Sequence, residues 1–280
     1  DYPSIYRYTF NIKKKICSIM RKNVNLKNFY NAVYTKGERK HFTTFIAQGT
    51  PTSESDEILN EVKWKGKKVL DVGCGTGLFA WNVAKKGANV MGIDYSEVAI
   101  EIANTRPKVS NLKFEKIDVK EIKGKFDIIV SIGTLEHMDD PLKTLRIMKK
   151  HLLPKGRIII TSPNYTNPRG YFLMTLLHLF GSPVTLADLH YQSPLDFMNY
   201  GKKLDMKLKW RTIDKSWAHG EVLIKDFKRR IPNVLRDSKL PCNKKNIKKF
   251  IDWIEENVLP FDNDLPHSGA TGLYNFSLKN

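Results

Sequence analysis

The 280-residue sequence lacks any long hydrophobic run. Its longest apolar stretch, 171–180 (YFLMTLLHLF), is far shorter than the roughly 18 residues that a membrane-spanning helix needs. No spanning helix is therefore expected, although 41% of the residues are hydrophobic and can build a sizeable core. Internal repeats and low-complexity tracts are missing too, and the length suits one globular domain with extensions.

Cysteine is scarce. The chain has Cys17, Cys74 and Cys242, and their spacing matches neither a disulfide framework nor a zinc site. This usage fits a reducing compartment. We therefore expect a cytoplasmic protein.

Acidic residues are in short supply: 29 Asp and Glu stand against 47 Lys and Arg, a formal net charge of +18. The positive charge is concentrated in residues 1–40 and 202–249. Such a surface suits an anionic partner, which would be RNA, an acidic membrane surface or a phosphorylated substrate. Composition alone leaves open the alternative of a lysine-rich face that only contacts solvent.

Residues 1–60 are predicted to form an N-terminal helical extension. Ile5, Tyr8, Ile12 and Ile16 recur at near-helical spacing among basic residues. Two interpretations follow: a basic amphipathic helix in peripheral contact with a membrane, or a lid packed on the rest of the domain.

The most informative segment is 69–77, VLDVGCGTG. Its apolar start suits a buried parallel strand. Gly73, Gly75 and Gly77 then turn the chain tightly into a helix, and without Cβ atoms they let the backbone approach a ligand closely. The spacing is not the G-x-G-x-x-G of dinucleotide-binding folds. Asp71 would repel a pyrophosphate but suits a cation.

Further strands are predicted at 88–93, 112–117 and 126–132, each followed by polar residues. In an open parallel sheet the ligand lies outside the carboxyl ends of the strands. Asp94 follows the first of these strands, where a carboxylate can accept the two hydroxyls of a ribose held over the glycine loop.

Later strands are predicted at 157–161, 206–213 and 273–278, with a turn at 154–156. Ser96 and Asp140 are predicted helix N-caps, and Ser193-Pro194 is predicted to start a helix that Gly201 stops. Another helix is predicted near the C-terminal end, and its apolar face is formed by Ile247, Phe250, Ile251, Ile254 and Val258.

The acid-x-G-x-G-x-G loop and the acids after the next strands resemble the class I S-adenosylmethionine (SAM)-dependent methyltransferases. The resemblance implies an α/β, Rossmann-like fold with a seven-stranded, mostly parallel sheet, helical lid insertions and SAM as the cofactor. It implies a SAM-binding domain at 61–280, with cap insertions at 163–192 and 214–271 over the acceptor.

In that family the acid after the third strand, here Asp118, takes the adenine amino group, and the next backbone N–H, of Val119, meets the ring. The predicted cofactor-binding residues are Asp71, Gly73, Cys74, Gly75, Gly77, Asp94, Tyr95, Asp118, Val119 and Ile132.

The loop 133–141, GTLEHMDDP, resembles the small-molecule O-methyltransferases of ubiquinone biosynthesis. The resemblance implies a phenolic or related hydroxyl acceptor. Metal-dependent members carry a further carboxylate at the position of Gly133, so no metal is expected here. The predicted catalytic residues are His137, His190 and Glu136. Either histidine could act as a general base, because imidazole titrates near neutral pH; packing or surface roles are the alternative.

The function predicted from these observations is SAM-dependent methyl transfer to a hydroxyl of a small molecule: a phenol, a quinone precursor or a sugar. The alternative is an RNA methyltransferase that uses the basic surface. Motifs of adenine-amino and pyrimidine carbon-5 enzymes are missing after the 126–132 strand. A third interpretation, a non-catalytic interaction subunit, would not need intact Asp71 and Asp94.

Overall fold

The computed structural model describes residues 53–182, 184, 188–214, 219–261 and 267–279. The amphipathic helix predicted near the N-terminus lies outside the described residues. Of the predicted 1–60 extension, only helix α3 (Ser53–Glu61) is described.

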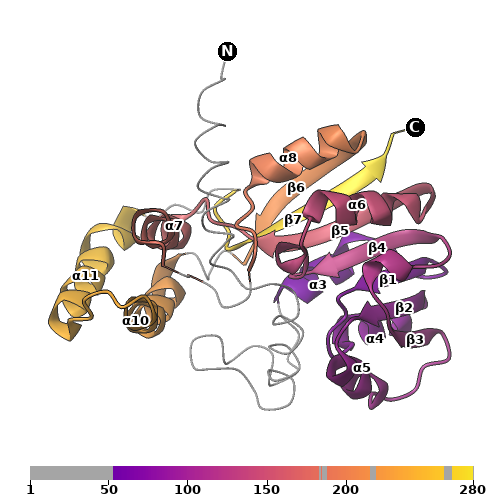
Figure 1. The fold of residues 1–280 in the computed structure, drawn as a ribbon, viewed down its shortest axis with the longest axis horizontal. Coiled ribbons are helices and arrows are strands. Elements are labelled where there is room, and N and C mark those ends of the chain that lie inside the picture. Colours follow the sequence, from indigo (N-terminus) through magenta and orange to yellow (C-terminus); the bar gives the residue numbers. More distant parts are fainter. Residues whose placement is uncertain (1–52, 183, 185–187, 215–218, 262–266, 280) are drawn as a thin grey trace.

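A seven-stranded sheet forms the centre of the structure (Figure 1). Its strands are β1 (Lys68–Val72), β2 (Asn89–Asp94), β3 (Leu112–Lys116), β4 (Phe126–Ile132), β5 (Leu152–Pro163), β6 (Met206–Ile213) and β7 (Thr271–Leu278). The order is β3-β2-β1-β4-β5-β7-β6, and β7 runs antiparallel to both of its neighbours. The predicted α/β architecture, with a seven-stranded and mostly parallel sheet, is confirmed.

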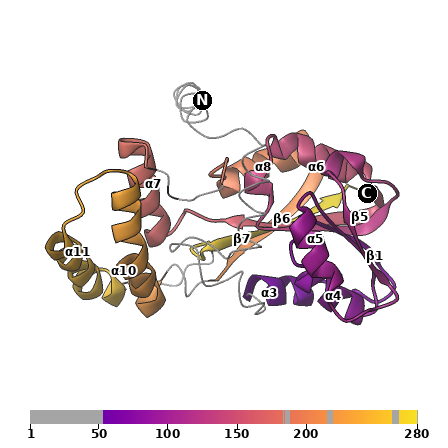
Figure 2. The ribbon, with the colours of Figure 1, turned by 60° about the horizontal axis from the view of Figure 1, so that its bottom comes forward.

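Helices cover both faces of the sheet (Figures 1 and 2). One face carries α3, α4 (Leu78–Lys85) and α5 (Glu97–Asn104); the other carries α6 (Pro141–Lys150) and α8 (Pro194–Lys203). Each face has its own buried apolar cluster against the strands. Because β1 and β4 are covered on both sides, their buried stretches hold runs of apolar residues, as central parallel strands do.

Local capping fixes where two of these helices begin. The Ser96 side chain accepts a hydrogen bond from the backbone N–H of Ala99, and the Asp140 side chain accepts one from Lys143. Both residues are the predicted N-caps, and each satisfies an N–H group that the first helical turn leaves without a partner. Short 3-10 turns follow β3 and β4: η1 (Val119–Glu121) and η2 (Leu135–His137).

Several predicted element ends differ from the structure by a few residues, and two of these differences are instructive. Helix α8 does not stop at Gly201 but continues to Lys203, because packing on the sheet outweighs the roughly 1 kcal/mol that glycine costs in a helix. The ring of Phe197 in α8 stacks on Tyr274, with centroids 3.7 Å apart. Strand β5 already begins at Leu152, and the predicted turn is an irregularity inside it, where Lys155 has φ 62°.

A second group of helices stands off the carboxyl end of the sheet (Figures 1 and 2). It contains α7 (Pro168–Phe180), α10 (Gly220–Asp237) and α11 (Lys244–Asn257), with the short η3 (Leu259–Phe261) after α11. Its apolar core is separate from those of the sheet. These helices come from the two predicted cap insertions. No helix in the part of the chain that the structure describes has the length and hydropathy to cross a membrane.

Candidate active site

The loop between β1 and α4 depends on its three glycines. Gly73, Gly75 and Gly77 have φ values of 73°, 50° and 73°, in the left-handed region that side chains disfavour. A Cβ on Gly73 would lie 2.4 Å from Thr134 Cγ2, and one on Gly77 would lie 2.4 Å from Phe114 Cζ. The loop is therefore tight, and at Gly73 it packs closely against Thr134 in the loop after β4.

Asp94 ties this loop to the one after β2. Its Oδ2 accepts a hydrogen bond from the backbone N–H of Gly75 at 3.0 Å, and its Oδ1 accepts one from Ser96 at 2.8 Å. A carboxylate has about four acceptor positions, so these hydrogen bonds leave capacity for a ribose hydroxyl. The side chain is buried, which suits an enclosed polar ligand.

Asp71, at the end of β1, is the side chain that best fits a bound cation. It is 2% exposed, and within the described residues its Oδ2 accepts no hydrogen bond. Burial, and then the charge of Asp94, raise the pKa of Asp71 to about 7. The amino-acid ammonium and the sulfonium of SAM would supply the positive charge that this carboxylate lacks. The residues at this edge therefore fit the predicted cofactor.

The remaining predicted cofactor residues surround the same loops. The Asp118 side chain accepts a hydrogen bond from Lys120 N and caps η1, and Val119 behind it is buried. Burial raises the pKa of Tyr95, whose hydroxyl makes no hydrogen bond within the described residues. The remaining two, Cys74 and Ile132, are half-buried on the loops after β1 and at the end of β4. Their contacts with SAM stay predictions.

Two of the predicted catalytic residues, Glu136 and His137, lie in η2, the short turn after β4. The carbonyl oxygen of Glu136 accepts hydrogen bonds from the backbone N–H groups of Leu189 and His190, at 3.0 and 3.1 Å. These two bonds fasten the segment after α7 to the loop after β4. They bring Asp188, which the sequence did not single out, next to the pair.

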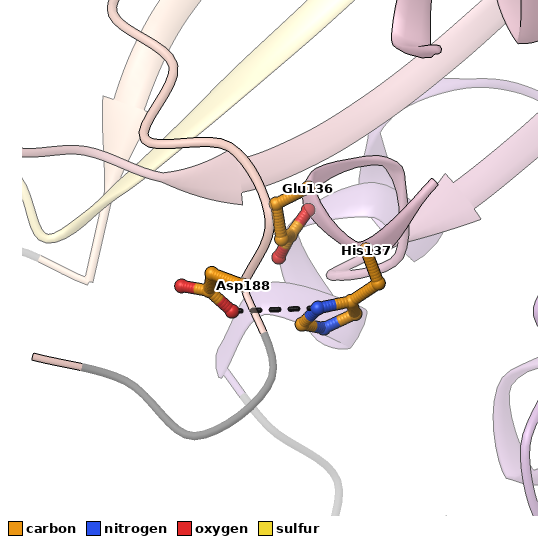
Figure 3. Close-up of side chains that lie close together, drawn as sticks. All are labelled: Glu136, His137 and Asp188. Carbon is orange, nitrogen blue, oxygen red and sulfur yellow. Dashed lines mark ion pairs between the residues drawn. The ribbon is translucent and has the colours of Figure 1, made fainter. Parts of the chain in front are cut away.

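Glu136, His137 and Asp188 form one cluster (Figure 3). His137 Nδ1 lies 3.4 Å from Asp188 Oδ1. The Glu136 side chain is 3% exposed, and its Oε2 has no hydrogen-bond partner among the described residues. Burial, then the charge of Asp188, raise the pKa of Glu136 well above its usual value. Burial beside a second acid therefore favours the neutral, protonated carboxyl of Glu136, whereas a cation in the cluster would favour the ionised form.

The same cluster bears on the prediction that no metal binds. One ligand atom from each of its three residues lies within 4.8 Å of the others, a geometry that a metal ion could use. Gly133 adds no ligand, and its φ of 53° disfavours a side chain there. The absence of a metal stays a prediction.

His190 does not join this cluster. Its Nε2 lies 3.2 Å from the carbonyl oxygen of Asp139, so the ring packs along the backbone of the loop after β4. Of the three predicted catalytic residues, the structure brings together the side chains of Glu136 and His137. Asp188, and not His190, lies beside His137.

Tyr165 was also missed by the sequence analysis. Its hydroxyl donates a hydrogen bond to Asp188 Oδ2 at 3.3 Å, while the other carboxylate oxygen faces His137. The only sequence signals were an acid two positions before His190 and an aromatic residue just after β5. Neither signal indicates a contact across the fold.

Comparison with known proteins agrees with this geometry. The family described as Methyltransferase domain matches residues 63–215, from before β1 to the end of β6. The chain belongs to this family. The prediction of a SAM-dependent methyltransferase fold, with SAM as its cofactor, is thereby confirmed.

Two curated relatives of this methyltransferase are ubiquinone biosynthesis O-methyltransferases. The one from Acinetobacter baylyi is 34% identical over 113 residues, which are 38% of this chain and 47% of the relative. The one from Pseudomonas aeruginosa is 32% identical over 117 residues, which are 40% and 50%. The aligned part spans about half the length of these relatives.

Solved structures show the same fold. A SAM-dependent methyltransferase from Mesorhizobium loti has a TM-score of 0.52 and 15% identity, covering 81% of this chain and 98% of its own. The magnesium protoporphyrin IX methyltransferase of Synechocystis PCC 6803, solved with bound SAH, also has a TM-score of 0.52 and 15% identity, covering 68% and 92%.

Proposed function

We propose that this methyltransferase moves the methyl group of SAM to a hydroxyl of a small molecule, such as a phenol, a quinone precursor or a sugar. The observation that carries the proposal is the contact between half-buried His137 and buried Asp188. The relatives named ubiquinone biosynthesis O-methyltransferase support an oxygen acceptor.

Methyl transfer from a sulfonium is an in-line displacement for which SAM supplies the reactive carbon. The chain has to align the acceptor and exclude water, and alignment alone can contribute about 7–11 kcal/mol. Gly73, Gly75, Asp71 and Asp94 would hold the cofactor. The helices α7 and α10, at the carboxyl end of the sheet, would enclose the acceptor.

The acceptor proton is the part of the reaction that the side chains perform. With Nδ1 of His137 directed at Asp188, the neutral ring carries its basic lone pair on Nε2. In the proposed mechanism Nε2 takes the hydroxyl proton as the oxygen attacks the methyl carbon. Asp188 fixes the ring orientation and stabilises the imidazolium that forms.

The test is methyl transfer from labelled SAM to three kinds of acceptor: catechols, sugars and total RNA. We expect label in the small molecules that depends on His137. The matched control is His190→Ala, which changes a histidine outside the acid cluster. Label only in amino groups, or none in any hydroxyl compound, would contradict the proposal.

RNA is a second candidate acceptor because α11 begins with a basic, exposed surface that includes Lys244, Lys245, Lys248 and Lys249. Binding to a single strand would then weaken with salt, with a log–log slope of about −0.7 per neutralised phosphate. Ribonuclease-sensitive label with that salt dependence would favour RNA over the small molecule.

Peripheral contact with a membrane, from a cytoplasmic location, is part of the proposal. Tyr171, Leu179 and Phe180 of α7 expose apolar side chains. Sedimentation with vesicles that contain acidic lipids tests this contact, and protein that stays in the supernatant at low salt would contradict it.

A further inference from the structure

A buried carboxylate in the helical group accepts hydrogen bonds from three arginines. The Asp226 side chain is 0% exposed. Its Oδ2 lies 3.0 Å from Nε of both Arg169 and Arg230, and its Oδ1 lies 3.0 Å from a terminal nitrogen of Arg229. Three guanidinium groups and one carboxylate leave the cluster short of negative charge. Buried charge is costly unless it is paired.

Arg169 has unused hydrogen-bonding capacity. Its side chain is 17% exposed, and within the described residues only its Nε makes a hydrogen bond. A guanidinium has five N–H groups, and buried donors nearly always have partners. Burial, and then the charge of Arg230, lower the pKa of Arg169. Each of these features favours a further anion at its terminal nitrogens.

The position of Arg169 connects the cluster to the candidate active site. It lies in the first turn of α7, just after β5 reaches the carboxyl end of the sheet. The first turn of α7 packs on the backbone of Tyr165, since a Cβ on Gly170 would lie 2.1 Å from its carbonyl oxygen. Tyr165 donates a hydrogen bond to Asp188, and Asp188 faces His137, so this turn of α7 lies on the side of the acid cluster that faces the cap.

We propose that Arg169, with Arg230 behind it, binds an anionic group, a carboxylate or a phosphate, on the methyl acceptor. This inference rests on the proposed function, to which it adds the charge of the substrate. The hydroxyl of the acceptor would face His137 and its anionic group would face α7. Planar guanidinium donors bind both kinds of oxyanion with strong, charge-assisted hydrogen bonds.

The experiment measures binding to the full chain loaded with SAH, by calorimetry, with probes that differ only in charge. The probes are 3,4-dihydroxybenzoate and the longer 3-(3,4-dihydroxyphenyl)propanoate, each with its neutral methyl ester, and inorganic phosphate. We expect at least one acid to bind about tenfold or more tightly than its ester, as a charge-assisted hydrogen bond predicts.

Two variants that break the same ion pair separate binding from packing. Arg169→Gln should abolish the preference for the acid. Asp226→Asn should increase it, because the arginines lose their internal counter-charge. If the cluster only fastens α7 to α10, both variants lose thermal stability and neither changes the preference, which would overturn the inference. Should Arg169→Gln fail to fold, the parent and Asp226→Asn still decide.

The remaining outcomes also decide. Equal binding of acid and ester to the parent would overturn the inference, as would inorganic phosphate that competes as well as the acid, since the anion would then not belong to the acceptor. Methylation of neutral phenols without acid preference would leave the proposed function standing and overturn this inference. Acid-selective binding that needs Arg169, without transfer to any hydroxyl, would support the anion site and contradict the hydroxyl acceptor of the proposed function.

Discussion

Nδ1 of His137 lies 3.4 Å from Oδ1 of Asp188, although the two residues come from distant segments of the chain (Figure 3). His137 belongs to η2, after β4, whereas Asp188 belongs to the connection between α7 and α8. The fold therefore gives the histidine an acidic neighbour that fixes its ring. This is the arrangement that a general base needs when the proton must leave in one direction.

Replacing His137 with Ala should lower turnover about 100-fold or more, because the acceptor would lose its base. SAM affinity should stay unchanged, since the glycine loop is untouched. Turnover with a catechol and calorimetry with SAM check the two halves. His190→Ala, whose ring contacts the Asp139 carbonyl, should stay within a few-fold of the parent. Parent-like turnover in both variants would mean that alignment alone suffices.

Asp188→Asn preserves the shape of the side chain and removes its charge, so it should lower kcat about tenfold or more while KM changes little. The loss would come from an imidazolium without a negative neighbour. Tyr165→Phe removes only the hydrogen bond at the other carboxylate oxygen and should have a smaller effect of the same kind. A rise in KM at constant kcat would instead place Asp188 in acceptor binding.

Turnover should survive removal of divalent metals. Gly133 supplies no ligand, and burial, which raises the pKa of Glu136, disfavours the ionised carboxylate that a metal needs. Rates after dialysis against EDTA, with and without added Mg²⁺, test this, together with the metal content of the purified protein. Activity that EDTA abolishes and Mg²⁺ restores would identify Glu136, His137 and Asp188 as metal ligands.

Much of the cofactor half could be predicted because its determinants are local. An apolar run, three glycines and an acid at the next strand end stand close together in the sequence, and the positive φ values of the loop leave little choice of residue. The ends of β4 and β6 were predicted to the residue, since each is a run bounded by polar or turn-forming positions.

The acceptor half could not be predicted in the same way. Asp188 reaches His137 only because two backbone N–H groups bond to the Glu136 carbonyl across the fold, and no sequence spacing encodes that contact. The three arginines around Asp226 likewise come from two helices. Gly201 failed as a helix stop for a related reason: burial against the sheet outweighed a local preference.

Asp94→Ala should weaken SAM binding by roughly 1–3 kcal/mol, because it leaves ribose hydroxyls unpaired in a buried site. The Gly75 and Ser96 N–H groups also lose their acceptor. Calorimetry measures the change. Asp94→Asn, which keeps one acceptor oxygen, should bind SAM with an affinity between those of the parent and Asp94→Ala. Unchanged affinity in Asp94→Ala would remove Asp94 from the cofactor site.

SAM binding should strengthen as pH rises through the pKa of Asp71, which is about 7 in the unliganded protein. The cation of SAM favours the ionised carboxylate, so binding lowers this pKa, and at lower pH part of the binding energy is used to expel the proton. The useful window is about pH 6 to about pH 7.5, below the titration of an α-amino group near 7.7–8.0.

Calorimetry in buffers of different ionisation enthalpy should show that binding releases protons, and that the number released per SAM approaches one at the lower end of this window. Asp71→Asn should bind more weakly and without this pH dependence. Constant affinity across this window in the parent would contradict the prediction. It would show that Asp71 is already ionised before SAM binds, so that binding displaces no proton from it.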